Sequence, residues 1–262
     1  MKERIITAIV MAAVFIPLLL IGSLPFLILV YILASIGLYE LCKMKQISIT
    51  SAPAIISFLL LWMLLIPDGG NGFFGTIDRK VQIFLLGLLC MLIVTVLSKN
   101  RFTFDHAGFL VISVLYVAMG FYFLFLTREQ GIGNVLFVLF TIWATDSGAY
   151  FVGKSVGKRK LWPEISPNKT VEGFLGGIIC ALAVAAGFIL FGNLSFSAGE
   201  MILLSIVVSI FGQLGDLVQS AYKRHYGVKD SGRLLPGHGG ILDRLDSVIF
   251  ILPILHLLTL MN

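Results

Sequence analysis

The stretch from Ile5 to Cys42, IITAIVMAAVFIPLLLIGSLPFLILVYILASIGLYELC, carries a single charged residue, Glu40. It contains two apolar runs, 5–22 and 25–42, and each is about long enough to cross a hydrocarbon core of roughly 30 Å as a helix. Charged residues ahead of an apolar run are also typical of a secretory signal, but the first run ends without an A-x-A-like cleavage site and a second run follows at once. The first run is therefore predicted to be a retained membrane helix.

Apolar runs of this kind recur along the whole chain. Of its 262 residues, 58% are hydrophobic and 13% are charged, and the mean hydropathy of +1.00 lies well above that of soluble domains. The fold class is therefore predicted to be all-α, a polytopic integral membrane protein with about nine transmembrane helices. The predicted spans are residues 5–22, 25–42, 52–67, 81–98, 108–126, 132–152, 174–191, 201–219 and 243–260.

Lysine and arginine predict the orientation, because short cytoplasmic loops are enriched in them. With a cytoplasmic amino terminus, 16 of the 19 Lys and Arg residues fall inside, and only Arg79, Lys80 and Arg128 fall outside. The net charge of +5 is therefore attributed to membrane topology, and no nucleic-acid partner is expected. We expect a multi-pass protein of the inner (cytoplasmic) membrane, with its active site facing the cytoplasm.

Polar residues divide the chain into two parts. Residues 1–131 are predicted to be a transmembrane scaffold, with little besides apolar helices and short loops. Residues 132–262 are predicted to be the catalytic half, with two cytoplasmic loops at 153–173 and 220–242. In the scaffold, Glu40 is interpreted as an interfacial charge that snorkels or pairs with Lys43.

Four aspartates of the second half are candidate functional residues. Asp146 and Asp216 lie inside predicted spans, where a carboxylate usually faces a cavity, a partner or an ion. The alternative is that each pairs with a buried Lys or Arg and only holds helices together. Asp243 and Asp246 stand three residues apart, so on a helix they share a face and can hold one hard cation. Helix starts favour Asp in any case, but here a glycine-rich turn and several cations flank the pair.

The loop 153–173 supplies cations and a helix start. A basic cytoplasmic loop beside anionic lipid needs no further function. Ser166 begins a Ser-Pro turn, however, and Thr170 can cap the next helix. Glu172, in the first turn of that helix, is either a metal ligand or a helix-start charge.

Together the two loops hold hard carboxylates, cations and flexible glycines, which is the inventory expected for a divalent metal with a polyphosphate. The sequence has no H-E-x-x-H, no C-x-x-C and no hydrolase elbow. His238, in the sequence PGHGG, either donates to a phosphate or only fixes the turn.

A long motif begins at Ser220 and reads S-A-Y-K-R-(4)-K-D-S-G-(3)-P-G-H-G-G-I-L-D-R-L-D. It resembles the signature of the phosphatidate cytidylyltransferases, also called CDP-diacylglycerol synthases. The upstream D-S-G-A-Y-F-V-G-K and S-P-N-K-T-V-E-G are similar to motifs of the same family, so the resemblance covers residues 143–247. The first half resembles the family only in length and hydropathy.

The resemblance implies transfer of CMP from CTP to phosphatidate in the membrane, which gives CDP-diacylglycerol and pyrophosphate with Mg²⁺ as the cofactor. It implies one or two metal ions held by Asp216, Asp243 and Asp246, with catalytic positive charge from Lys223, Arg224 and Arg244. The implied substrate-binding residues are Ser166, Lys169, Ser220, Lys229, Asp230 and His238. The partners are CTP, phosphatidate and membrane lipid, and a homodimer is left open.

Two other functions are alternatives to CMP transfer. A CTP-dependent lipid kinase or another membrane phosphotransferase would need similar metal and cations, but the D-G-x-x-A-R pattern of the CDP-alcohol phosphotransferases is absent. A transporter with Asp146 and Asp216 as ion ligands predicts inverted repeats and interrupted helices in both halves. The polar residues lie in one half, which favours an enzyme.

Overall fold

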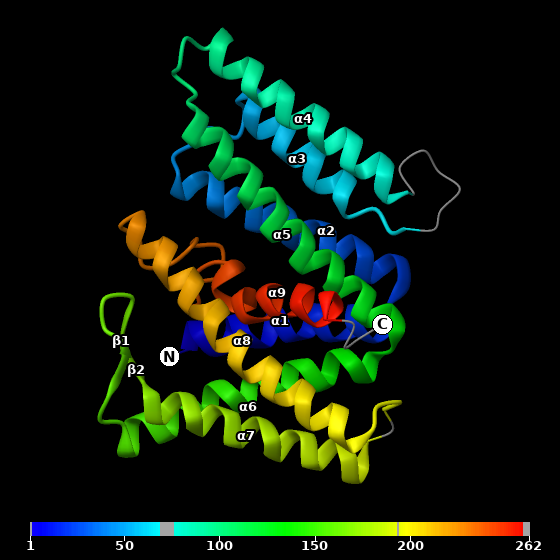
Figure 1. The fold of residues 1–262 in the computed structure, drawn as a ribbon, viewed down its shortest axis with the longest axis vertical. Helices are drawn as coiled ribbons and strands as arrows, with labels where there is room; N and C mark the ends of the chain where they lie inside the picture. The colour runs from blue at the N-terminus through cyan, green and yellow to red at the C-terminus, as the bar shows by residue number, and fades with distance from the viewer. Residues whose placement is uncertain (1, 69–75, 193, 259–262) are drawn as a thin grey trace.

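The computed structural model describes residues 2–68, 76–192 and 194–258, and Figure 1 shows their arrangement. Across these ranges the helices are α1 (Lys2–Ile21), α2 (Ser23–Met44), α3 (Ala52–Leu64), α4 (Ile77–Leu97), α5 (Phe104–Gln130), α6 (Ile132–Val156), α7 (Val171–Phe191), α8 (Ala198–His225) and α9 (Leu242–Leu257). A two-stranded sheet, β1 (Lys160–Trp162) and β2 (Ser166–Thr170), follows α6. The last two residues of the predicted span 243–260, and the side chains of Lys2 and Arg4, lie outside the described part.

The helices coincide with the predicted apolar runs, but they differ in length. Among the described residues six helices are long and apolar enough to cross a membrane: α2, α4, α5, α6, α7 and α8. The apolar part of α1 (Ile5–Ile21) and α3 are shorter, and α9 has 16 residues. The prediction of an all-α, multi-pass membrane protein is confirmed at this level.

The second half differs from the prediction at both of the loops that were predicted to be cytoplasmic. α8 continues to His225, so Ser220, Lys223 and Arg224 lie on its last turns and not in a loop. The loop 153–173 begins with the end of α6 and contains the antiparallel β1–β2 pair, in which Trp162 lies opposite Ser166. Pro163 and Pro167 lie in or beside these strands, and because proline lacks an N–H and fixes its φ, a helix is disfavoured there.

Glycines on α7 allow it to pack very close to α6. An added Cβ at Gly173 would lie 2.6 Å from the carbonyl oxygen of Ala149, and one at Gly176 would lie 2.5 Å from Cβ of Val152. Small residues at helix contacts are typical of membrane proteins, where close van der Waals packing replaces the hydrophobic effect between helices. The α6–α7 pair is thus a closely packed unit that leads into the β-strands.

The helix ends bring the polar segments of the second half together. In Figure 1, the amino end of α1, the carboxyl end of α8, the β-strands and the amino end of α9 lie towards the left of the molecule. α9 and α1 run through its middle, between α6–α7 and the helices α2–α5. Leu242 and Ile249 of α9 are buried against this core. The signature at residues 220–246 is therefore held at one end of the helix bundle.

Candidate active site

Asp243, in the first turn of α9, is surrounded by donors. Its Oδ1 accepts hydrogen bonds from Lys223 Nζ at 2.8 Å and from Gln219 Nε2 at 3.2 Å, both on α8. Its Oδ2 accepts from the backbone N–H of Ser231 at 2.7 Å and of Gly240 at 2.9 Å. The side chains of Lys223 and Asp243 are only 15% and 6% exposed, so the two form a partly buried ion pair that ties α9 to α8.

The turn between α8 and α9 depends on its glycines. Gly237 and Gly239 have φ angles of 75° and 83°, which side-chain-bearing residues rarely adopt. The turn is closed by a bridge between Leu235 and Gly239. An added Cβ at Gly239 would lie 2.6 Å from Oδ2 of Asp243, so this glycine also makes room for the carboxylate.

His238 and Arg244 form the open edge of this turn. Arg244 is exposed, and its Nε and Nη2 donate to the carbonyl oxygen of His238 at 2.9 and 2.8 Å. Nδ1 of His238 is buried and has no hydrogen-bond partner in the described chain. The guanidinium is thus held in place by the backbone of the turn, and the His238 ring carries one buried polar atom whose hydrogen-bonding capacity is unused.

Three further carboxylates lie close to one another across α6, α8 and α9. Asp146 and Asp216 interact electrostatically with each other, and both interact with Asp246. Lys169 of β2 partly offsets this negative charge, because its Nζ lies 2.7 Å from Oδ2 of Asp216. Lys223 also acts electrostatically on Asp246. The repulsion within this cluster would be relieved by a bound cation.

The segment Ile165–Lys169, at β2, contacts α8 at three points: the ion pair between Lys169 and Asp216 and two hydrogen bonds. Besides its ion pair, Lys169 donates to the carbonyl oxygen of Gln213 at 3.3 Å. Arg224 Nε lies 3.4 Å from the carbonyl oxygen of Ile165, just before β2. Glu172 accepts the backbone N–H groups of Lys158 and Arg159, so its carboxylate shapes the turn before β1.

A cavity of about 530 Å³ opens beside this polar end. Its walls are mostly apolar side chains of α1, α2, α6 and α9, including Phe15, Leu33 and Ile142. His238, Arg244, Asp246 and Asp146 also line it. A mostly apolar cavity that also has polar residues in its lining suits an amphiphilic ligand.

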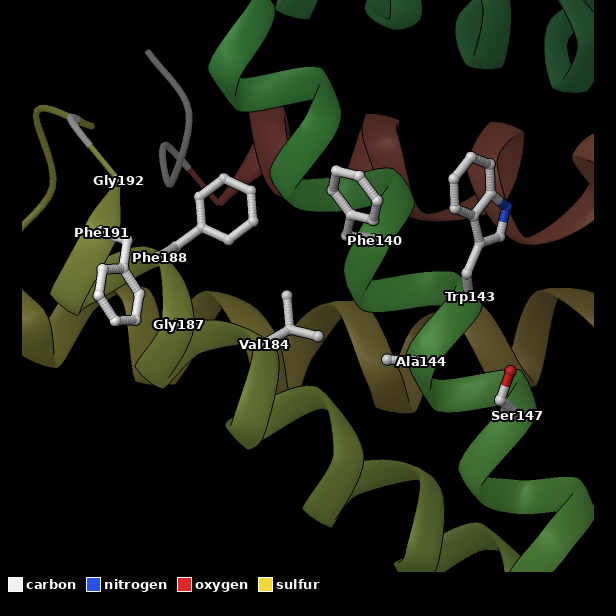
Figure 2. A pocket seen from close by; sticks show the side chains of 9 residues that line it. All are labelled: Phe140, Trp143, Ala144, Ser147, Val184, Gly187, Phe188, Phe191 and Gly192. Carbon is white, nitrogen blue, oxygen red and sulfur yellow. The ribbon is translucent and has the colours of Figure 1, made fainter. Parts of the chain in front are cut away.

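A second hollow, between α6 and α7, has a different character. It measures about 620 Å³ and is lined by Phe140, Trp143 and Phe188 among others. Figure 2 shows these rings spread along the two helices, with Ser147 at one end. None of its lining residues is ionisable, so we place the chemistry at the first cavity although this hollow is larger.

A metal ion finds suitable donor chemistry here, although no ready set of ligands. Carboxylate oxygens are the donors that Mg²⁺ prefers, and Asp146, Asp216 and Asp246 provide them around one region. Over the described ranges, no three His, Cys, Asp or Glu side chains converge in a metal-binding geometry. Asp243 is already saturated by protein donors and becomes a ligand only if one of them, such as Lys223, moves away.

Comparison with known proteins adds the family. The model of the cytidylyltransferase family matches residues 2–261. The chain belongs to the cytidylyltransferase family. It is 50% identical over 261 residues to the phosphatidate cytidylyltransferase of Bacillus subtilis (strain 168), covering 98% of this chain and 97% of that one. It is 47% identical over 258 residues to the enzyme of that name from Staphylococcus haemolyticus, with 98% of each chain covered. With that of Staphylococcus aureus (strain COL) it shares 46% identity over all of both chains.

The predicted site residues of this cytidylyltransferase fall into two groups. Contacts or electrostatic interactions join Lys169, Asp216, Lys223, Asp243 and Asp246, and the cavity adds His238 and Arg244. Ser166 lies at the start of β2, Ser220 lies on α8, and Lys229 and Asp230 are exposed in the loop after α8. Arg224 points its Nε at the residue before β2.

Two carboxylates of this cytidylyltransferase, Asp146 and Glu40, lie closer to the candidate site than the sequence predicted. From the sequence, Asp146 is named as a carboxylate inside a predicted span but is not assigned to the site. Its position in the span 132–152, which leads directly into the basic loop 153–173, is a usable signal. The interpretation of Glu40 as an interfacial charge that snorkels or pairs with Lys43 is wrong: Glu40 is 2% exposed and accepts hydrogen bonds from Ser231 and from the N–H groups of Ile241 and Leu242 at the start of α9. A single sequence offers no signal for a contact made across about 200 residues.

Proposed function

We propose that the protein transfers CMP from CTP to phosphatidate, giving CDP-diacylglycerol and pyrophosphate. The observation that carries this proposal is the 46–50% identity, over nearly the full length of both chains, to relatives named phosphatidate cytidylyltransferase. The phosphate oxygen of phosphatidate is already anionic, so its attack on the α-phosphorus of CTP needs little general-base help. The main obstacle is the repulsion between two polyanions.

Positive charge fixed by the fold would reduce this repulsion. Arg244 and Lys223 face the cavity side and the carboxylate cluster, and Arg224 and Lys169 approach from the β-strand side. We assign triphosphate binding to these four cations, with His238, Ser166, Ser220, Lys229 and Asp230 at the edges of the same site. Preorganised cations stabilise charge that develops on the transferred and leaving phosphates.

Mg²⁺ is the proposed cofactor, as one or two ions. Asp216 and Asp246 would hold it with help from Asp146, and Asp243 would join them only after exchanging a protein donor. When bound, the ion would neutralise charge on the triphosphate and on the leaving pyrophosphate. Asp243 meanwhile holds Lys223 in place, which keeps one cation beside the cluster.

The apolar cavity is the proposed place for phosphatidate. Acyl chains would lie among the side chains of α1, α2 and α6, and the phosphate would face Arg244 and His238.

We also propose nine crossings, a cytoplasmic amino terminus, and a site at the inner face of the cytoplasmic membrane, with residues 1–131 as scaffold and 132–262 as the catalytic half. The distribution of Lys and Arg supports this orientation. A homodimer is a further proposal, which a measurement of the oligomeric state in detergent would test.

One assay tests the reaction. The protein purified in detergent is given Mg²⁺, CTP and phosphatidate, and the lipid product and pyrophosphate are both followed. CDP-lipid with an equal amount of pyrophosphate is the expected result. CDP together with a phosphorylated lipid would instead indicate a kinase, and ion-dependent solute flux in vesicles without either product would indicate a transporter. Omission of Mg²⁺ is expected to abolish turnover.

A further inference from the structure

Glu40 lies on α2, in the half of the chain that was interpreted as scaffold, yet its contacts are with the signature. Its Oε1 accepts the backbone N–H of Ile241 at 2.8 Å. Its Oε2 accepts the N–H of Leu242 at 3.0 Å and the hydroxyl of Ser231 at 2.8 Å. We propose that Glu40 is a positioning residue of the active site, which fixes the start of α9 and the loop before it against α2.

The first step of the argument concerns the amino end of α9. The first N–H groups of a helix have no partner within the helix, and a local side chain usually caps them. Ile241, at the N-cap position, has no side chain that can do so. Glu40, from a distant helix, supplies the acceptor for two of these groups, so the position of α9 is tied to α2 by hydrogen bonds as well as by packing.

The second step concerns the link from Glu40 to Asp243. The Ser231 hydroxyl lies 2.8 Å from Oε2 of Glu40 and 3.0 Å from Oδ2 of Asp243, and its single proton is shared between them. The backbone N–H of Ser231 also binds Asp243. A shift of Glu40 would therefore move Ser231, Asp243 and the Lys223 that is paired with it.

The third step concerns the glycines of the signature. An added Cβ at Gly240 would lie 2.4 Å from Oε2 of Glu40, and one at Gly232 would lie 2.7 Å from Oε1. At Gly232 the Glu40 side chain occupies the space that a Cβ would take, and at Gly240 the Ser231 hydroxyl, at 2.2 Å, and the Glu40 carboxylate occupy it together. The signature is thus shaped around a residue that lies outside it.

A buried carboxylate is a costly way to hold two helices together, because apolar packing does the same without desolvating a charge. The benefit of this one lies in orientation, since it accepts three donors: the Ser231 hydroxyl, which also binds Asp243, and the N–H groups of the two residues just before Asp243. This inference rests on the proposed function, because Glu40 would act through the active site to which that function is assigned. Residues that orient other functional groups typically change activity by about 10- to 100-fold when they are replaced.

The test uses Glu40→Gln, which keeps the length of the side chain but has one acceptor oxygen in place of two. We expect kcat per folded molecule to fall by about 10- to 100-fold, and hydrogen exchange in residues 231–245 to become faster. Thr127→Val is the matched control: Thr127 is fully buried and hydrogen-bonds His256 near the other end of α9. It is expected to lower the melting temperature while kcat per folded molecule and exchange in residues 231–245 stay as in the wild type.

A merely structural role makes a different prediction, since it would lower the amount of folded protein but not kcat per folded molecule. Unchanged kcat, or unchanged exchange in residues 231–245, would overturn the inference. If Glu40→Gln does not accumulate, Ser231→Ala takes its place, with a loss at the lower end of the same range and the same change in exchange. A wild-type protein that makes no CDP-lipid would refute the proposed function alone, because the exchange comparison still tests the role of Glu40.

Discussion

At the scale of single residues, Asp243 and Asp246 share a helix turn but have different surroundings. Asp243 is satisfied by Lys223, Gln219 and two backbone N–H groups. Asp246 accepts a hydrogen bond from the N–H of its neighbour Ser247, and it faces the repulsion of other carboxylates. The first aspartate therefore has donors on both of its oxygens, whereas the second is the one that the proposed function assigns to a cation.

Asp246→Asn tests this difference. It removes one negative charge while keeping the shape of the side chain, so repulsion from Asp216 and Asp146 falls. We expect kcat to drop by about 100-fold or more, because the electrostatic groups of a reaction site are worth about 3–4 kcal/mol each, while the melting temperature stays equal or rises. Activity and thermal unfolding in detergent give the two values. Asp105→Asn, at an exposed carboxylate in the first turn of α5, is the control and should leave activity unchanged. Normal turnover by Asp246→Asn would remove Asp246 from the site.

At the scale of elements, the β1–β2 pair contributes one cation, Lys169, to the proposed site. Loss of its contact with Asp216 in Lys169→Met should release the strands from α8 and remove a cation from the triphosphate side. A hydrogen bond to a charged group contributes about 1.5–3 kcal/mol, so kcat/KM for CTP should fall by about 10- to 100-fold. Lys160→Met, an exposed lysine on the neighbouring strand, is the control. Equal effects of the two substitutions would mean that only the net positive charge of the hairpin matters.

The contact between α6 and α7 gives a second prediction at this scale. Gly176→Ala would place a methyl group 2.5 Å from Cβ of Val152, whereas Gly187→Ala, about three turns further along α7, meets nothing within 4 Å. Overpacking of this kind costs about 1–3 kcal/mol, and an alanine at an uncrowded helix position gains up to about 1 kcal/mol over glycine. The unfolding free energy in detergent should therefore fall for the first variant and stay equal or rise for the second. A fall of similar size in both would show that close approach of the helices is not the cause.

The elements also show how far the sequence alone reaches. Apolar length predicts the helices well, because a run that must satisfy its backbone in lipid has few choices. It fails at Ser220 and Lys223, since an amphipathic extension of α8 beyond the apolar run has the composition of a loop. The signature residues could be predicted because they lie close together in the chain. Glu40 could not, because its role arises only when α2 and α9 pack together.

At the scale of the whole molecule, the proposed orientation separates two populations of cations. Lys80 and Arg128, predicted outside, are both engaged: Lys80 pairs with Asp68 at 2.8 Å, and Arg128 donates to the carbonyl oxygen of Leu20 at 2.8 Å. Of the 16 cations predicted inside, ten lie in the second half, between Lys154 and Arg244, where the β-strands and the signature are. A triphosphate arriving from the cytoplasm would meet the positive end of the molecule, and phosphatidate would reach the same place from within the inner leaflet.

Single-cysteine labelling on the two sides of α7 tests this orientation. In a background without Cys42, Cys90 and Cys180, Lys160→Cys and Ser195→Cys lie on opposite ends of α7, and both positions are exposed. A membrane-impermeant maleimide should label only Ser195→Cys in intact cells and both after permeabilisation. The reverse pattern would invert the topology and move the site to the outer face.

The short helix α3 decides whether there are nine crossings. Its 13 residues span only about 20 Å at 1.5 Å per residue, less than a typical hydrocarbon core. Thr50→Cys and Thr76→Cys flank it and are exposed. If α3 crosses, with the bilayer thinned locally around it, only Thr76→Cys is labelled in intact cells. If the two behave alike, α3 does not cross, and the orientation of α4 must then be settled by labelling at the far end of that helix, at Ser98→Cys.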